Sequence, residues 1–263
     1  IVLSPLRSLI FDQVEALKKK GINAELLNGD LPKTKKNKLF KELEKNYPSI
    51  KILYSTPESI MCNEETRVVF QDLFKRGLLS RIVLDEAHCI STWGHEFRPN
   101  YLKVKNIKNV FPDIPIAAFT ATATEKVNAD IQDILQLDEH TQVFESSFIR
   151  HNLNIVIRSR GSKKNDINEC LSEIVEELDV KYINQSAILY AFSRNKCEEI
   201  SGVLLENGIK SDFYHAGLSA KKRNEIQTKW LDGELQIICA TIAFGMGIDK
   251  PNVRVVYHFN LPK

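Results

Sequence analysis

The chain has 263 residues, of which 43% are hydrophobic and 27% are charged, and its formal net charge is +2. This length allows two domains with separate cores, and the composition is that of a globular protein with no apolar run near the roughly 20 residues of a membrane helix. The five cysteines are scattered without a C-x-x-C pair, so the sequence predicts no zinc site. This distribution favours a reducing compartment.

Short β-branched runs alternate with longer segments of helical period along the whole chain. In the first helical segment, Leu9, Val14 and Leu17 form one apolar stripe. The expected strands cover residues 1–3, 24–27, 50–54, 82–84, 116–119, 155–157, 187–192, 212–215, 235–240 and 253–257. Helix ends are expected at Gly21, Gly77, Gly208 and Gly233. This alternation predicts an α/β fold with mostly parallel sheets covered by helices on both faces.

The pattern loosens between Val143 and Asn154 and then restarts. We therefore expect two domains, 1–147 and 148–263. The chain begins directly with a strand-like run and has no initial Met, and another such run lies close to its end. The expectation is that the first domain is incomplete at its N-terminal side and the second at its C-terminal side.

Two adjacent acids follow the apolar run at 82–84. Ligands of open α/β sheets bind outside the carboxyl ends of the strands, where Asp85 and Glu86 are expected. Nucleotide hydrolysis needs one carboxylate to hold Mg²⁺ and a second group to deprotonate the attacking water. Asp85 is the candidate for the metal ligand and Glu86 for the base. His88 follows two residues later in the same stretch. The alternative is a solvated strand end.

An aromatic-rich stretch follows at 89–101. It contains Trp93, Phe97 and Tyr101, together with His95 and Arg98, among Gly and Pro residues. Aromatic rings in such a loop are suited to stack on unpaired bases, and an arginine can contact phosphate or a ring face. The alternative is a small hydrophobic cluster beneath the loop.

The stretch Asp85-Glu86-Ala87-His88, followed directly by this loop, resembles motif II and its extension in the RecQ family of superfamily 2 DNA helicases. Further stretches resemble the other family motifs in the family's order: 2–14 (motif Ia), 55–58 (Ib), 119–123 (III), 190–194 (IV), 214–218 (IVa) and 240–251 (V). Within the family, the stretches at 4–9 and 150–153 are most similar to the Bloom syndrome type. The resemblance implies two RecA-like domains that couple ATP hydrolysis to 3′-to-5′ movement on DNA.

The resemblance also implies roles for individual residues, each of which has a structural alternative such as a turn, a cap or a buried side chain. Catalysis would use Asp85, Glu86 and His88, with Mg²⁺ on Asp85. The nucleotide would be bound near Asp85, Glu86, Gly245, Gly247 and Asp249. DNA contact and coupling would involve Ser4, Pro5, Arg7, Thr56, Pro57, Glu58, Trp93, His95, Phe97, Arg98, Thr120, Thr122, Ser193, Arg194, His215 and Thr241.

The implied cofactors are ATP and Mg²⁺, without zinc. The implied partners are single-stranded and branched duplex DNA, ATP, and proteins of recombination and repair, with no membrane. The expected location is the nucleus in a eukaryote and the cytoplasm otherwise.

No glycine in the chain is followed by lysine, so the phosphate-binding pattern G-x-x-x-x-G-K-[ST] is absent from the 263 residues. Motif I is expected upstream of Ile1 and motif VI beyond Lys263, so the 263-residue chain alone is predicted to lack ATPase activity. Two other functions stay open. One is an RNA-directed superfamily 2 helicase, and the other is a catalytically dead RecA-like module that binds DNA or a partner.

Overall fold

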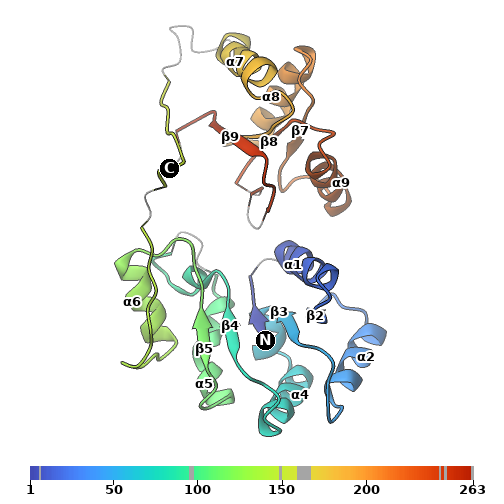
Figure 1. Cartoon of the computed structure of the whole chain (residues 1–263), viewed down its shortest axis with the longest axis vertical. Coiled ribbons are helices and arrows are strands. Elements are labelled where there is room, and N and C mark those ends of the chain that lie inside the picture. Colours follow the sequence, from blue (N-terminus) through green and yellow to red (C-terminus); the bar gives the residue numbers. More distant parts are fainter. Residues whose placement is uncertain are drawn as a thin grey trace. The chain divides into compact units, whose positions relative to one another are not determined.

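A computed structural model describes residues 1–5, 7–94, 98–147, 150–158, 167–242, 244–245 and 248–261. The chain divides into two compact units, Ile1–Ser146 and Ser147–Lys263, and each is described by itself (Figure 1). Among the described residues, no helix is both long and apolar enough to cross a membrane.

The first unit is built on a sheet of five parallel strands in the order β2-β3-β1-β4-β5. The strands are β1 (Val2–Leu3), β2 (Ala24–Leu27), β3 (Ile52–Ser55), β4 (Ile82–Leu84) and β5 (Ile116–Ala118). Because all five strands are parallel, their carboxyl ends lie along one edge of the sheet.

Helices cover both faces of this sheet. They are α1 (Arg7–Lys19), α2 (Lys33–Leu43), α3 (Pro57–Met61), α4 (Glu64–Lys75), α5 (Ile107–Val110), α6 (Glu125–Ile134) and the 3₁₀ helices η1 (Ala87–Ile90) and η2 (Tyr101–Asn106). The larger core joins Leu27 of β2 to Phe40 and Phe70 of α2 and α4. Alternation along β2 places Ala24 in a second core with Val14 of α1. The sheet is therefore buried on both sides.

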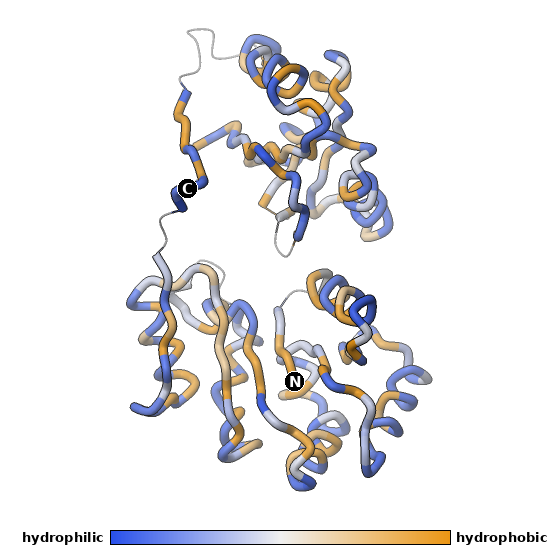
Figure 2. The backbone as a smooth tube through the Cα atoms, viewed as in Figure 1, coloured by the Kyte–Doolittle hydropathy of each residue, from blue (hydrophilic) through white to orange (hydrophobic). Residues whose placement is uncertain are grey.

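The second unit repeats this plan with four parallel strands in the order β7-β8-β6-β9. Its elements are α7 (Ile167–Glu176), the π-helical turn η3 (Glu177–Lys181), β6 (Ser186–Tyr190), α8 (Arg194–Glu206), β7 (Ser211–Tyr214), α9 (Ala220–Leu231), β8 (Ile237–Ala240) and β9 (Val253–His258). Successive residues of β6 face different cores, since Leu189 packs with α7 and α8, whereas Ile188 packs with Trp230 of α9. Figure 2 shows hydrophobic residues recurring along the strands of both units.

The α/β fold class predicted from the sequence is confirmed, and all four predicted helix-ending glycines have positive φ. The strand expected at 155–157 is wrong. These residues have no regular structure, and Ile155 and Ile157 are 87% and 83% exposed. A β-branched run forms a strand only when a neighbour supplies hydrogen bonds, and none does so among the described residues.

Candidate functional site

The parallel sheet of the first unit gathers polar residues at one edge. Strands β3, β1, β4 and β5 are neighbours in that order, and Thr56, Ser4, Asp85 and Thr120 follow their carboxyl ends. This is the edge at which α/β sheets bind ligands. Residues separated by more than a hundred positions in the sequence therefore lie along one edge.

The carboxylate of Asp85 is held by two donors. Its Oδ2 accepts a hydrogen bond from Ser4 Oγ at 3.2 Å, and its Oδ1 accepts one from the Glu86 backbone N at 3.0 Å. Each oxygen keeps lone-pair capacity for a cation. Among the described residues, no group of three or more His, Cys, Asp or Glu could hold a metal ion. One carboxylate fits a Mg²⁺ ion whose other ligands are waters and phosphate oxygens.

Glu86 has an unusual backbone conformation, with φ 51° and ψ 46°. The left-handed region costs a residue with a side chain about 1–2 kcal/mol, and such strain is concentrated at functional sites. The carboxylate of Glu86 reaches His88, with its Oε2 lying 3.3 Å from His88 Nδ1. The same Nδ1 lies 2.9 Å from Thr120 Oγ1, so buried His88 joins the segment after β4 to the segment after β5. The Glu86 carboxylate remains partly exposed and can take a proton from a water molecule.

The aromatic loop presents one exposed ring to solvent among its described residues. The side chain of Trp93 is 62% exposed, and the ammonium of Lys126 on α6 lies 3.0 Å from its ring centroid. The loop packs tightly against η1 at Gly94, where a Cβ atom would lie 2.3 Å from the carbonyl oxygen of His88. Only glycine fits at this position, so the backbone beside Trp93 lies directly against the backbone of His88.

Two later residues of the loop stabilise the edge of the sheet. Arg98 Nη1 donates to the carbonyl of Pro5 at 2.8 Å. Tyr101 is buried, and its hydroxyl contacts the carbonyls of Leu3, at 3.0 Å, and Asp85. Burial, followed by the nearby charge of Asp85, raises the pKa of Tyr101 well above its ordinary value, so the hydroxyl stays a donor.

The sequence-based suggestion that Tyr101 stacks on bases is therefore wrong. Its spacing from two other buried residues, Val104 and Ile107, would have indicated a core position, because all three recur every third residue.

Replacing Tyr101 with phenylalanine should lower the free energy of unfolding of the first unit by about 1–3 kcal/mol. The change removes the hydroxyl donor from the carbonyl of Asp85, and it leaves the Leu3 carbonyl with only the backbone N of Asp85 as a donor, at 2.8 Å. Urea unfolding followed by circular dichroism measures the effect. The matched control is Tyr47→Phe, because Tyr47 is 91% exposed. Equal unfolding midpoints for Tyr101→Phe and wild type would contradict the stabilising role of the hydroxyl.

The second unit also gathers predicted residues at the carboxyl ends of its strands. Ser193, His215 and Thr241 follow β6, β7 and β8, which are neighbours in the sheet. Ser193 caps α8 by accepting from Lys196 N at 3.2 Å. The backbone N of Thr241 donates to the Tyr214 carbonyl at 3.2 Å.

Position 245 in the second unit accepts only glycine, because of its backbone conformation and its contact with Tyr190. Its φ is +119°, and a Cβ atom here would lie 2.3 Å from the hydroxyl of Tyr190. That hydroxyl donates to the carbonyl of Phe244 at 2.9 Å, which fixes the turn after β8 to β6. Asp249, further along the same loop, is exposed.

Comparison with known proteins agrees with this arrangement. Residues 1–131 match the model of the DEAD/DEAH box helicase family, and residues 166–263 match the helicase conserved C-terminal domain. Over its full length the chain is 44% identical to the RecQ-like DNA helicase blm-1 of Caenorhabditis elegans and 41% identical to the ATP-dependent helicase SGS1 of Saccharomyces cerevisiae. The chain belongs to the RecQ family of helicases. It spans 26% and 18% of the lengths of these two relatives.

Solved structures support the fold of this RecQ chain. The helicase MrfA, in a crystal structure bound to DNA and AMPPNP, has a TM-score of 0.71 at 19% identity over 99% of the chain and 37% of its own. The Saccharomyces cerevisiae protein dbp5, carrying the change l327v and bound to gle1 and ip6, has a TM-score of 0.68 at 19% identity over 99% of the chain and 61% of its own. The RecA-like architecture expected from the motifs is confirmed.

Some predicted site residues of the RecQ chain are engaged with the protein itself. Ser4 and Thr56 are buried, and the Thr56 hydroxyl lies 3.0 Å from that of Ser59. Thr122 is exposed, and its backbone N donates to Thr120 Oγ1 at 3.2 Å. His95, Phe97, Gly247 and the side chain of Arg7 lie outside the described residues.

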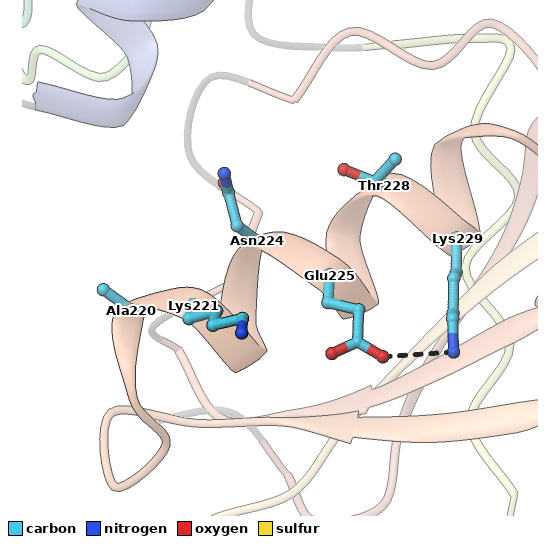
Figure 3. Close-up of a pocket in the computed structure, with 6 residues that line it drawn as sticks. All are labelled: Ala220, Lys221, Asn224, Glu225, Thr228 and Lys229. Carbon is cyan, nitrogen blue, oxygen red and sulfur yellow. Dashed lines mark ion pairs between the residues drawn. The ribbon is translucent and has the colours of Figure 1, made fainter.

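Pockets do not by themselves locate a site in this RecQ chain. One cavity of about 300 Å³ lies beside the predicted contacts Thr56 and Glu58 and is also lined by Asn28 and Lys36. Another follows α9 alone, and Figure 3 shows its lining side chains along that one helix, with Lys229 paired to Glu225 at 3.2 Å. None of the residues that line this cavity on α9 is among the site residues predicted from the sequence.

Proposed function

We propose that this chain is the motor core of an ATP-dependent DNA helicase that moves 3′ to 5′ along one strand. The observation that carries the proposal is the connected group at the edge of the first sheet. Asp85 and Glu86 follow β4, His88 links Glu86 to Thr120, and the loop bearing Trp93 packs on the backbone of His88. Hydrolytic residues and an exposed stacking ring thus belong to one continuous segment.

The hydrolytic roles follow from the chemistry of this group. Asp85 would hold Mg²⁺, which supplies positive charge to the phosphates of bound ATP. Glu86 would accept a proton from the attacking water, and His88 would keep the Glu86 carboxylate in place through the contact between them. The second unit would contribute Gly245, Gly247 and Asp249 to nucleotide binding.

The DNA-binding roles rest on the exposed ring of Trp93 and on groups that suit phosphate. Trp93 would stack on a base, and Phe97 and His95 of the same loop are proposed to assist it. Arg98 and Thr122 would link the loop to the nucleotide site. Contacts with the sugar-phosphate backbone of the DNA are assigned to ten residues of the two units: Ser4, Pro5, Arg7, Thr56, Pro57, Glu58, Ser193, Arg194, His215 and Thr241. These contacts would bind the strand without reading its sequence.

Relatives favour DNA over RNA as the substrate, because blm-1 of Caenorhabditis elegans is named a DNA helicase. Work on branched DNA in recombination, repair and replication, within a eukaryotic nucleus and alongside other repair proteins, is part of the same proposal. The similar fold of the Saccharomyces cerevisiae protein Dbp5, solved bound to RNA and ADP BeF3, keeps an RNA-directed helicase as the second candidate.

The test is ATP hydrolysis by the full-length protein with single-stranded DNA or with RNA of equal length and sequence. We expect DNA to raise the rate at least ~10-fold, the scale of one stacking contact of about 1–3 kcal/mol, and RNA to have little effect. Equal stimulation by RNA would favour an RNA-directed helicase. DNA binding without hydrolysis would favour a catalytically dead binding module.

A further inference from the structure

Helix α2 carries an excess of positive charge. Its 11 residues include five lysines and one glutamate, a net charge of +4, whereas the whole chain has a net charge of +2. One side of α2 is apolar and places Leu39 and Phe40 in the core of the first unit. Lys35, Lys38 and Lys41 recur every third residue outside that side, and all three are exposed. These three lysines form the basic face of α2.

The charges of the basic face are not neutralised by neighbouring side chains. In the part of the chain that the structure describes, none of its three lysines makes an ion pair or a side-chain hydrogen bond. Lys36, on another side of the helix, does pair with Glu65 at 2.6 Å. The one acid of the helix, Glu42, is bonded to Lys45 and Ser49. Like charges three residues apart repel each other, so the basic face weakens its own helix.

The amino end of α2 is also unfavourable for positive charge. Pro32 supplies no side-chain cap, and the first turn has no acid but contains Lys33 and Lys35. Positive charge at a helix N-terminus opposes the helix dipole. Helix α4 of the same unit begins in the opposite way, with Asn63 as a cap and Glu64 in its first turn. Charges that weaken the helix they occupy indicate a function outside that helix.

The basic face lies apart from the residues already assigned to function. Helix α2 connects the parallel strands β2 and β3, so it runs from their carboxyl ends back toward their amino ends. Strand β2 is the outermost strand of its sheet, and α2 lies at that side of the first unit (Figure 1). Strand β4, which precedes Asp85, is the third strand inward from β2. No residue assigned to the nucleotide or to the single strand lies on α2.

The composition of the exposed side of α2 favours duplex DNA over other anionic partners. The polar residues between the lysines are Thr34 and Asn37, and the one aromatic ring of the helix, Phe40, is buried. Single strands are bound largely by aromatic rings on which bases stack. Protein interfaces are enriched in aromatic residues and arginine and depleted in lysine. Lysines without exposed rings suit the phosphates of a double helix, which they contact as point charges.

We propose that the basic face of α2 binds the phosphate backbone of a duplex arm, the double-stranded part of a branched DNA substrate. From Lys35 to Lys41 the face extends over about 9 Å of the helix axis, a length over which a DNA duplex presents about five negative charges. Such contacts bind any base sequence. The inference goes beyond the proposed function, which assigns no residue to the duplex.

The experiment measures equilibrium binding of the full-length protein, without ATP, to a duplex with a 3′ single-stranded tail and to the tail alone. The double variant Lys38→Gln/Lys41→Gln removes two charges and keeps residues of high helix propensity. At about 0.1 M salt we expect its affinity for the tailed duplex to fall at least ~10-fold. The slope of log affinity against log salt should become shallower by about 1.8, which is 0.9 for each lost phosphate contact. Affinity for the tail alone should stay within about twofold of wild type, because distant charges are screened.

A matched control removes the same charge elsewhere in the first unit. Lys19 and Lys20 are exposed at the carboxyl end of α1, which packs in a different core from α2. Lys19→Gln/Lys20→Gln should bind the tailed duplex within about twofold of wild type. The variant of the basic face should melt at or above the wild-type temperature, because it removes repulsion between like charges.

Four results would overturn the inference. Wild-type affinity of Lys38→Gln/Lys41→Gln for the tailed duplex would show that the basic face is only solvated. Equal losses for the tailed duplex and the tail alone would assign α2 to the single strand. An equal loss in the α1 control would reduce the effect to overall charge, and a lowered melting temperature accompanying the loss would assign the lysines to folding. Binding is measured without ATP, so a failure of the proposed helicase activity is distinguishable from a failure of this inference.

Discussion

Replacing Glu86 with glutamine should slow DNA-stimulated ATP hydrolysis by the full-length protein at least ~100-fold, the usual scale for losing a general base. Glutamine keeps the size of the side chain and can still accept from His88 Nδ1, 3.3 Å from the present carboxylate. It cannot take a proton from water. Nucleotide and DNA affinities should stay within about twofold of wild type, because no binding group is removed. Steady-state turnover and equilibrium binding measure the two effects.

Two variants make this result specific. Glu139→Gln removes the same charge from an exposed residue after α6 and should hydrolyse ATP like wild type. Asp85→Asn should instead weaken Mg²⁺-dependent nucleotide binding, because the carboxylate proposed to hold the ion becomes neutral. Turnover by Glu86→Gln at the wild-type rate would assign the base to another residue.

Replacing Trp93 with alanine should remove most of the stimulation of ATPase activity by single-stranded DNA, about tenfold, and leave the basal rate unchanged. Stacking of one base is worth about 1–3 kcal/mol, which changes the equilibrium between two loop conformations tenfold or more. The loop can transmit this shift because Gly94 packs against the carbonyl of His88. Lys126 covers one face of the Trp93 ring. A base that displaces Lys126 from this face leaves the lysine ammonium available for a phosphate.

A packing role for Trp93 predicts a different result. In that case the melting temperature and the basal rate would fall together. Trp93 is 62% exposed, so we expect neither to change. Tyr47→Ala is the matched control, since it removes a ring that is 91% exposed and precedes the amino end of β3. A Trp93→Ala protein that is stable and still fully stimulated by DNA would contradict both accounts.

The fold and the location of the acids were predictable because each depends on local pattern. Alternating apolar runs and helix-ending glycines specify a parallel α/β sheet, and in such a sheet the residues that follow β4 must lie at the ligand-binding edge. Asp85 and Glu86 lie there. Motif order then supplied the family, which no single motif could have done.

Contacts between distant segments could not be predicted in this way. The link from His88 to Thr120 joins residues 32 positions apart, and that from Glu198 to His215 joins residues 17 apart. The left-handed backbone of Glu86 carries no signal either, because glutamate rarely adopts it. The composition around Tyr101 is that of a binding loop, whereas its three-residue spacing from Val104 and Ile107 is that of a buried position. Partners fixed by tertiary packing are visible only in the structure.

The most direct test of the central claim is strand separation by the full-length protein on a DNA duplex with a 3′ single-stranded tail, compared between wild type and Glu86→Gln with ATP present. The account predicts that wild type separates the strands, that Glu86→Gln binds the same DNA without separating it, and that a 5′-tailed duplex is not a substrate. Strand separation by Glu86→Gln at the wild-type rate, or none by wild type under conditions in which it hydrolyses ATP, would contradict the account.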